Sequence, residues 1–440
     1  MSGETVVVGL GKSNLSAVKH LLKYGCAPIV VDTRQQPALL SELPSEVEFR
    51  SGSLDSFAEL FKNASTLVTG PGIPVSSPAI AAAQAAGVEV IGDIELFARS
   101  AKAPIVAITG ANGKSTVTTL VGLMGRLAGI KTGVGGNIGI PALDLLDDPA
   151  DLYVLELSSF QLETTRSLRA HACTILNITE DHMDRYDFDI EKYAAAKHII
   201  YNNAKGIVYN RQDARTLPEK PAETMASFGA DAADYGLLHS DKETYLVKKG
   251  RKIMPVSEMK IVGRHNQLNA LAAMALADMA GIDETAQIEV LRTFAGLEHR
   301  CQFVAEIHGV RYYNDSKATN VGSTLAAVDG LSSVVRGGIF LLAGGIGKGQ
   351  DFSPIGGLLR GRVKRMFCYG RDAAELLKLG ERAEPAQNLE DALNKARAEA
   401  ADGDAVLLAP ACASMDMFRN FEERGEIFTA LVKKLEAENA

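Results

Sequence analysis

The chain has 440 residues and a mass of 46.8 kDa, and at roughly 150 residues per domain this length predicts about three domains. The hydrophobic fraction of 46% and the charged fraction of 23% are ordinary for a folded protein and exclude global disorder. The net charge of −8 argues against broad non-specific nucleic-acid binding, but it does not exclude a small basic pocket that binds an anion. The five scattered cysteines form no CxxC pair, as is typical of reduced thiols in a cytosolic protein. With neither a leader pattern nor a run of ~20 apolar residues, we expect a cytoplasmic protein that contacts no membrane.

The first part of the chain alternates short β-branched runs with a helical pattern. We predict strands over 6–8, 29–31 and 88–91 and a helix over 13–24. Gly9-Leu10-Gly11 follows the first strand and Asp32 ends the second, which is part of a dinucleotide-binding fingerprint, but Asn14 replaces the third glycine. This pattern predicts a Rossmann-like turn near a ribose or a phosphate, and it leaves an NAD-dependent oxidoreductase as an alternative.

The same alternation continues twice more along the chain. We predict strands over 105–108, 152–155, 174–176, 339–343, 365–369 and 405–409, and helical segments over 263–281, 373–379 and 389–401. The polar stretch from 213 to 255 predicts a small antiparallel insertion. Repeated strand–helix alternation favours parallel sheets covered by helices, so we expect an α/β fold. We place boundaries near Gly92 and His299, which give domains over 1–92, 93–298 and 299–440.

The strongest motif is TGANGKST at 109–116, which follows a predicted strand and precedes an apolar helical run. Glycines in such a loop let backbone N–H groups turn toward phosphates, and the helix N-terminus adds a favourable dipole. Lys114 would reach the β/γ-phosphates and the Ser115 hydroxyl would meet Mg²⁺. Only two residues separate the first glycine from Gly-Lys, where the common phosphate loop has four.

Further polar residues follow predicted strands, where ligands bind in open α/β sheets. Glu156 ends an apolar strand and suits Mg²⁺, which prefers oxygen ligands. His182 lies in an acidic loop after the next strand and predicts either a metal ligand or an orienting group. Lys197 lies in a helical pattern, which by itself is typical of a surface charge. Near the third domain, arginine, lysine and aspartate at predicted sheet edges suit an anionic substrate.

Taken together and in order, the motifs resemble those of the Mur ligases of peptidoglycan synthesis. The resembling segments are TGANGKST, ELSSFQLE, NITEDHMDRY, YAAAKHIIY, GRHNQLNA, GLEHR, NDSKATN, LAGGIGKGQDF and PACASMDMFRNFEERG. They run over nearly the whole chain, and the short phosphate loop is the family's own form. The resemblance implies three domains: a Rossmann-like N-terminal domain for UDP, a central P-loop ATPase-like domain and a Rossmann-like C-terminal domain for the amino acid.

The implied activity is ATP-dependent amide formation in cell-wall precursor synthesis, with roles in cell shape and cell division. ATP would phosphorylate the alanyl carboxylate of UDP-N-acetylmuramoyl-L-alanine, and the amine of D-glutamate would then displace phosphate. The implied cofactors are ATP, two Mg²⁺ ions and a CO₂-derived carbamate on Lys197, a modification that replaces an ammonium with an oxygen-donor anion. We expect a monomer that binds neither nucleic acid nor membrane.

The resemblance also implies the site residues. The expected catalytic residues are Lys114, His182 and Lys197. The expected ATP contacts are Gly110, Ala111, Asn112, Gly113, Lys114, Ser115, Thr116, Asn266, Asn269, Arg300 and Asp315. The expected metal ligands are Ser115, Glu156, His182 and Lys197. The expected contacts of the UDP-linked substrate are Ser13, Asp32, Thr33, Arg34, Gly72, Asn137 and His182. The expected D-glutamate contacts are Lys317, Thr319, Lys348, Ser414 and Phe421.

Four alternatives stay open at this point. A diaminopimelate-adding member of the same family is disfavoured because the chain has no Asp-Asn-Pro-Arg segment. A folate-polyglutamate ligase would share the ATPase core, but such an enzyme begins near its phosphate loop and this one does not. An NAD-dependent oxidoreductase would use the N-terminal turn, although its fingerprint is incomplete. A catalytically inactive nucleotide-binding regulator is disfavoured because the motif lysines, glutamate and histidine are all present.

Overall fold

The computed structural model describes residues 4–240, 243–261, 263–332 and 335–438. Two compact units make up the chain. Unit 1 consists of Met1–Ile178, Glu191–Pro255 and Asn269–Leu291, and unit 2 consists of Thr179–Ile190, Val256–Leu268 and Arg292–Ala440. Within the described residues, no helix combines the length and apolar character needed to span a bilayer.

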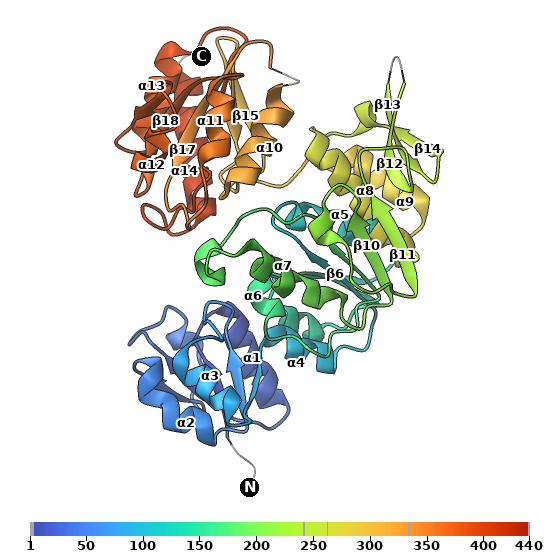
Figure 1. The fold of residues 1–440 in the computed structure, drawn as a ribbon, viewed down its shortest axis with the longest axis vertical. Helices are drawn as coiled ribbons and strands as arrows, with labels where there is room; N and C mark the ends of the chain where they lie inside the picture. Colours follow the sequence, from blue (N-terminus) through green and yellow to red (C-terminus); the bar gives the residue numbers. More distant parts are fainter. Residues whose placement is uncertain (1–3, 241–242, 262, 333–334, 439–440) are drawn as a thin grey trace. The chain divides into compact units, whose positions relative to one another are not determined.

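The first sheet of unit 1 is parallel, with strand order β3-β2-β1-β4-β5. Its strands are β1 (Thr5–Val8), β2 (Ile29–Asp32), β3 (Glu48–Ser51), β4 (Thr66–Thr69) and β5 (Glu89–Ile91). Its helices are α1 (Lys12–Lys23), α2 (Ala58–Asn63), α3 (Pro78–Ala85) and α4 (Asp93–Ser100). Helices α2 and α3 pack on each other, and α1 packs against α4 (Figure 1). The central strands are buried because β-branched residues fill both faces between these helix layers.

The second sheet of unit 1 has nine strands in the order β14-β13-β12-β11-β10-β9-β6-β8-β7. Its strands are β6 (Ile105–Thr109), β7 (Thr132–Gly136), β8 (Leu152–Glu156), β9 (Ala172–Ile175), β10 (Gly206–Asn210), β11 (Thr224–Phe228), β12 (Tyr235–His239), β13 (Thr244–Lys248) and β14 (Arg251–Pro255). The associated helices are α5 (Lys114–Leu127), α6 (Ser159–Leu162), α7 (Ile190–His198), α8 (Arg264–Met279) and α9 (Glu284–Thr293). Residues of α7 and α8 divide between the two units.

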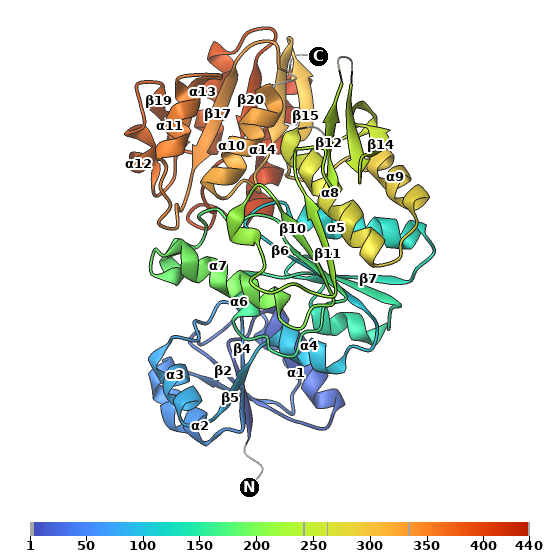
Figure 2. The same ribbon diagram turned by 45° about the vertical axis from the view of Figure 1, so that its right-hand side comes forward.

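The predicted antiparallel insertion over 213–255 is only partly right. Strands β12 to β14 are antiparallel to one another, but β11 is parallel to β10 and continues the central sheet. Strand β14 lies beside α9 in both views (Figures 1 and 2), where Arg251 pairs with Glu284. The polar stretch therefore extends the sheet to its edge instead of forming a separate module.

The sheet of unit 2 has the order β15-β16-β20-β17-β18-β19, in which only the β15–β16 pair is antiparallel. Its strands are β15 (Gln302–Ile307), β16 (Val310–Asn314), β17 (Ile339–Gly344), β18 (Val363–Tyr369), β19 (Ala383–Pro385) and β20 (Ala405–Leu408). Its helices are α10 (Val321–Ser332), α11 (Ser353–Leu359), α12 (Ala373–Leu377), α13 (Leu389–Glu399) and α14 (Phe421–Glu438). Separate apolar clusters cover the two faces of this sheet. Three sheets, with mainly parallel pairing, confirm the α/β fold class.

Candidate active site

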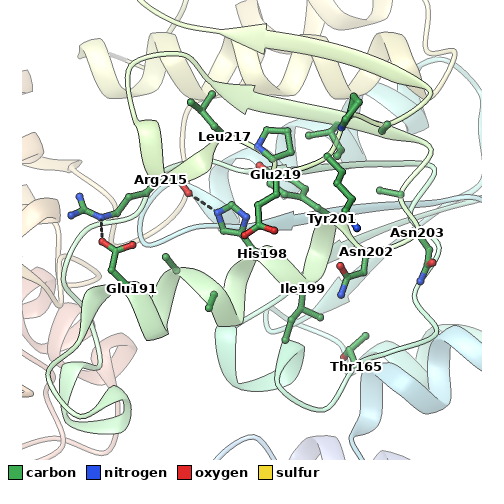
Figure 3. Close-up of a pocket in the computed structure, with 18 of the residues that line it drawn as sticks. Thr165, Glu191, His198, Ile199, Tyr201, Asn202, Asn203, Arg215, Leu217 and Glu219 are labelled. Atoms are coloured by element: carbon green, nitrogen blue, oxygen red, sulfur yellow. Dashed lines mark hydrogen bonds and ion pairs between the residues drawn. The ribbon is translucent and has the colours of Figure 1, made fainter.

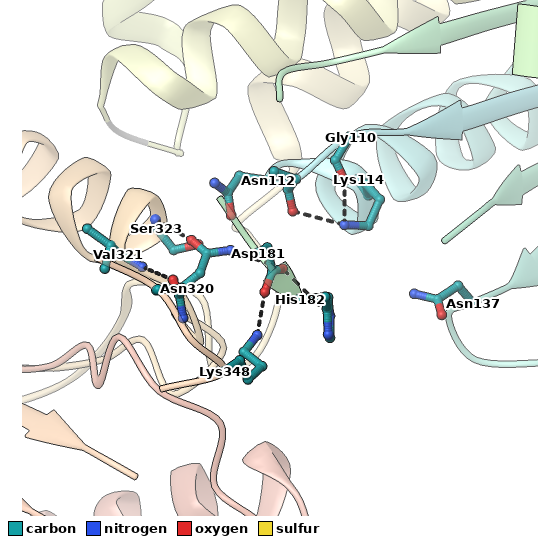
Figure 4. Close-up of polar contacts among 12 residues, drawn as sticks. Gly110, Asn112, Lys114, Asn137, Asp181, His182, Asn320, Val321, Ser323 and Lys348 are labelled. Carbon is teal, nitrogen blue, oxygen red and sulfur yellow. Dashed lines mark hydrogen bonds and ion pairs between the residues drawn. The ribbon is translucent and has the colours of Figure 1, made fainter. Parts of the chain in front are cut away.

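The motif at 109–116 forms a strand–loop–helix turn, as its pattern predicts. Strand β6 is buried along its whole length, and α5 begins at Lys114 with Gly113 as its N-cap. Gly110 and Gly113 have positive φ angles of 149° and 85°, a backbone region that favours glycine. The Lys114 ammonium donates to the carbonyl oxygens of Gly110 at 2.7 Å and Ala111 at 2.9 Å (Figure 4). The lysine therefore folds back over the loop, where a bound phosphate would offer it a charged acceptor.

Asn177 holds this loop from the neighbouring strand end, and our sequence-based prediction did not include it among the site residues. Its side chain accepts from Asn112 N at 2.8 Å and donates to Asn112 O at 3.0 Å, while its carbonyl accepts from Ala111 N at 2.9 Å. The signal was its place shortly after β9, at the same sheet edge as the loop. Asn269 of α8 also borders the loop, because a Cβ on Gly113 would lie 2.4 Å from its Oδ1.

Lys197 is buried, with 1% of its surface exposed. Its ammonium donates to Gly110 O at 3.1 Å and lies 4.4 Å from the centre of the Tyr193 ring. The interpretation of this lysine as a surface charge, which follows from its helical pattern alone, is wrong. The structure brings Lys197 and the phosphate loop together within unit 1.

Glu156 ends β8 and is 3% exposed. Its Oε1 accepts from the Asn137 side chain at 2.8 Å, whereas no donor among the described residues reaches its Oε2. A buried carboxylate oxygen without a donor fits a cation ligand, since leaving it unpaired is costly. Ser115, the other predicted ligand at this end of the sheet, is 5% exposed. Among the described residues, no three histidine, cysteine or acidic side chains are placed so that they could hold a metal ion. Glu156 and Ser115 suit an ion that takes further ligands from phosphates and water.

The N-terminal sheet holds five of the predicted contacts of the UDP-linked substrate, Ser13, Asp32, Thr33, Arg34 and Gly72, at or after the ends of β1, β2 and β4. Asp32 Oδ2 accepts from Leu10 N at 2.7 Å, and Arg34 donates to both oxygens of Asp32. Burial opposes ionisation, but the hydrogen bonds from Arg34 and Leu10 outweigh it and lower the pKa of Asp32 to about 2. Thr33 and Gly72 are exposed. Asp32 therefore orders the glycine turn as a permanent anion and leaves the exposed positions open to a ligand.

Unit 2 contains His182 and most of the remaining predicted residues. Lys348 forms an ion pair with Asp181, which also accepts from Asn320 at 3.3 Å (Figure 4). His182 has a positive φ of 54°, and its Nε2 lies 3.7 Å from Asp181 Oδ2. Asp181 is a second residue that our prediction missed. It follows the same strand end as Asn177, but its acidic loop was equally consistent with a solvated surface.

Two further pairs assemble within unit 2. Lys317 Nζ lies 3.7 Å from the centre of the Phe421 ring. Asp315 is 9% exposed, and its burial raises its pKa to about 7 despite the opposing charge of Arg300. The remaining predicted residues of this unit are Asn266 in α8, Thr319 and the buried Ser414.

A cavity of about 1130 Å³ lies on the other side of α7 from the phosphate loop. Figure 3 shows Glu191 and His198 of this helix beside Arg215, and all three line the cavity. Arg215 donates to Glu191 at 2.9 Å, and its carbonyl contacts His198 Nε2 at 2.7 Å. None of the predicted site residues is among the described residues that line this cavity.

Comparison with known proteins covers nearly the whole chain. Three family models match it: "Mur ligase MurD-like, N-terminal domain" over residues 3–92, "Mur ligase middle domain" over 108–277, and "Mur ligase, glutamate ligase domain" over 299–412. The UDP-N-acetylmuramoylalanine–D-glutamate ligase of Escherichia coli strain K12 is 54% identical over 432 residues, which cover 98% of each chain.

Solved structures show the same fold at low sequence identity. The UDP-N-acetylmuramate-alanine ligase of Thermotoga maritima is 19% identical with a TM-score of 0.62, covering 99% of this chain and 100% of that one. The MurF ligase of Thermotoga maritima in complex with ADP is 16% identical with a TM-score of 0.62, covering 98% of this chain and 96% of that one. Because the family models together match most of the chain and a 54% identical relative spans nearly all of it, the chain belongs to the Mur ligase family.

Proposed function

We propose that the chain is an ATP-dependent amide ligase that joins D-glutamate to UDP-N-acetylmuramoyl-L-alanine in peptidoglycan precursor synthesis. The observation that carries this proposal is the 54% identity, over 98% of both chains, to a relative whose name states that activity. The turn at 109–116 supports the ATP dependence, because it combines two positive-φ glycines with a lysine at a helix N-terminus.

The reaction has two steps. A carboxylate is a poor electrophile, so an alanyl carboxylate oxygen first attacks the γ-phosphorus of ATP, and ADP leaves. The amine of D-glutamate then attacks the acyl carbon, the bond from carbon to the phosphate oxygen breaks, and inorganic phosphate leaves. The transferred phosphoryl group requires positioning and charge neutralisation more than covalent help.

The chain's own residues supply that positioning. Backbone N–H groups of the loop from Gly110 to Thr116 hold the triphosphate, and Lys114 moves from its carbonyl acceptors to the transferring phosphoryl group. Glu156 and Ser115 hold one Mg²⁺, with Asn137 keeping the glutamate oriented through its 2.8 Å hydrogen bond. When bound, Mg²⁺ neutralises charge on the phosphate oxygens.

We assign His182 and Lys197 to a second Mg²⁺, with Lys197 as a carbamate. The carbamate adds an anionic oxygen donor in place of an ammonium. Burial of the Lys197 amine supports this assignment, because a buried amine gains most from losing its charge. Carbamate formation needs the neutral amine, so bicarbonate and alkaline pH favour it.

The other predicted contacts complete the proposed substrate sites. We assign Ser13, Asp32, Thr33, Arg34, Gly72, Asn137 and His182 to the UDP-linked substrate, Asn266, Asn269, Arg300 and Asp315 to ATP, and Lys317, Thr319, Lys348, Ser414 and Phe421 to D-glutamate. The domain division over 1–92, 93–298 and 299–440 follows the same assignment. We also propose a cytoplasmic location, because ATP and a UDP-linked precursor are metabolites of the cytoplasm, and we keep the prediction of a monomer.

The test measures phosphate release with ATP, Mg²⁺ and UDP-N-acetylmuramoyl-L-alanine while D- and L-amino acids are varied one at a time. Release that depends on D-glutamate and yields the amide product supports the proposal. Release with L-glutamate and a folate in place of the UDP-linked substrate would reassign the enzyme to folate chemistry. Oxidation or reduction of a nicotinamide nucleotide with any of these substrates would contradict the ligase function.

A further inference from the structure

Asp93 is a buried carboxylate that none of the proposed functions above uses. It is the first residue of α4 and is 2% exposed. Its Oδ2 accepts from the Gln161 side chain at 3.0 Å, and the Ser13 side chain lies beside the same carboxylate. The carboxylate thus joins α1 of the first sheet to α6 of the second, and all of these residues belong to unit 1.

On one side, Asp93 reaches the turn that follows Glu156. Gln161 forms a capping box with Ser158, in which Ser158 N donates to Gln161 Oε1 at 3.1 Å and Gln161 N donates to Ser158 Oγ at 3.2 Å. Since Oε1 is occupied by Ser158, the amide nitrogen of Gln161 must face Asp93. Ser158 lies two residues after Glu156, so the box and Asp93 together fix where this turn leaves β8.

On the other side, Asp93 reaches the start of α1. Ser13 lies in the first turn of that helix, directly after the Gly9–Gly11 turn, and is one of the proposed contacts of the UDP-linked substrate. A hydroxyl beside the Asp93 carboxylate is oriented by that acceptor, and its lone pairs stay available to another donor. Asp93 therefore orients a side chain at each of two proposed sites.

The packing around Asp93 leaves little room for movement. A Cβ on Gly92 would lie 2.3 Å from Thr164 Oγ1, so the backbone before Asp93 lies directly on the segment after α6. The Gln161 amide donates to this carboxylate, so an amide at position 93 would set an N–H₂ group against another donor.

We propose that Asp93 is a positioning residue that couples the UDP-substrate loop at Ser13 to the turn after Glu156, through its hydrogen bond with Gln161. This inference rests on the proposed function for the identity of the ligand. It predicts that the Asp93–Gln161 contact controls affinity for the UDP-linked substrate, although neither side chain is exposed.

The test exchanges donor and acceptor across this contact. Asp93→Asn removes one acceptor, and Gln161→Glu removes the donor but keeps the oxygen that accepts from Ser158. The double variant restores a complementary pair, because the amide introduced at position 93 then donates to the carboxylate introduced at position 161. The matched control is Glu95→Gln, since the buried Glu95 of the same helix bonds Arg166 N and Ser167 N across the same seam but contacts neither Ser13 nor Gln161.

Calorimetric titration with UDP-N-acetylmuramoyl-L-alanine, without ATP or Mg²⁺, reads out the coupling, and thermal unfolding reports the folding of each variant. We expect each single substitution at the contact to raise Kd about tenfold, as for a lost hydrogen bond to a charged group. The double variant should recover to within about threefold of the wild-type Kd. Glu95→Gln should lower Tm and leave Kd unchanged.

The inference is overturned if Asp93→Asn and Glu95→Gln both lower Tm and both leave Kd unchanged. It is also overturned if the double variant binds no better than the weaker single variant. If Asp93→Asn does not fold, Gln161→Glu and the double variant still decide the question. A wild-type protein that fails to bind this ligand contradicts the proposed function instead, which separates the two failures.

Discussion

Glu156→Gln should make the unliganded protein more stable while removing its activity. The glutamate is buried, and its Oε1 accepts from Asn137 at 2.8 Å, whereas its Oε2 has no donor among the described residues. Glutamine keeps an oxygen for Asn137 and puts a neutral amide N–H₂ in place of the oxygen that has no donor, so the buried group no longer carries a charge. An unpaired buried charge costs more than an unpaired neutral amide, and a gain of about 1 kcal/mol corresponds to a rise in Tm of roughly 2–4 °C for a folding unit of 150–250 residues.

The same substitution removes the carboxylate that we assign to Mg²⁺. Losing a group that stabilises transition-state charge typically costs ~10²–10³ in kcat. Differential scanning fluorimetry, with and without ATP and Mg²⁺, measures the stability change, and phosphate release measures the activity. The rise in Tm that these ligands cause in the wild type should shrink in the variant. The control is Glu219→Gln, which is exposed and should change neither quantity.

The assignment of Glu156 is refuted by a folded Glu156→Gln variant whose phosphate release equals that of the wild type. An unchanged ligand-dependent rise in Tm would refute it equally. A lower Tm in the unliganded variant would contradict the argument that its second oxygen lacks a partner in the folded protein.

Three further predictions use other parts of the site. Lys114→Ala should abolish ligation in a folded protein, because the charge of Lys114 is needed at the phosphoryl group. Phosphate release measures this, with Lys131→Ala, which removes an exposed lysine, as the control. Normal turnover of Lys114→Ala would count against the phosphate loop. Lys197→Ala should lose most activity, and acetate or formate should restore part of it by supplying a carboxylate, whereas full activity in CO₂-depleted buffer would rule out the carbamate. Burial raises the pKa of Asp315 from 3.8 to about 7, so the folded protein binds the proton more tightly than the unfolded chain does. The free energy of unfolding therefore falls as the pH rises from about 4 to 7. At ~1.4 kcal/mol per pKa unit, the loss amounts to ~4 kcal/mol at most. Asp315→Asn should remove that slope in Tm measured from pH 5 to 8, and parallel curves for both proteins would disprove it.

Hydrophobic patterning predicted several buried strands closely but missed exposed strands and some buried ones, among them β4 at Thr66–Thr69 and β10 at Gly206–Asn210. The predicted strand over 29–31 is β2 at Ile29–Asp32, and the predicted 105–108 is β6 at Ile105–Thr109. Strand β3 was missed because its residues Glu48–Ser51 are mostly exposed, so nothing in their hydropathy marks a strand. The parallel pairing of β11 with β10 was also missed, since it joins segments whose polarity suggested a separate insertion.

The candidate site was likewise predicted only in part. The phosphate loop was predictable because strand, glycines, lysine and helix are contiguous. Burial of Lys197 was not predictable. A lysine in an alanine-rich helical pattern is expected to be exposed, and only the tertiary packing places Gly110 O beside it. Asn177 and Asp181 act through contacts with residues far along the chain; their place after a predicted strand put them at the sheet edge, but a single sequence does not identify their partners.

The central claim is that ATP activates the substrate carboxylate as an acyl phosphate, and transfer of ¹⁸O tests it most directly. UDP-N-acetylmuramoyl-L-alanine labelled with ¹⁸O in both alanyl carboxylate oxygens is converted with ATP, Mg²⁺ and D-glutamate, and the phosphate is analysed by mass spectrometry. One labelled oxygen should appear in each phosphate released, because the attacking carboxylate oxygen stays on phosphorus when the amine breaks the bond to carbon. Unlabelled phosphate released in step with amide formation would contradict the acyl-phosphate mechanism.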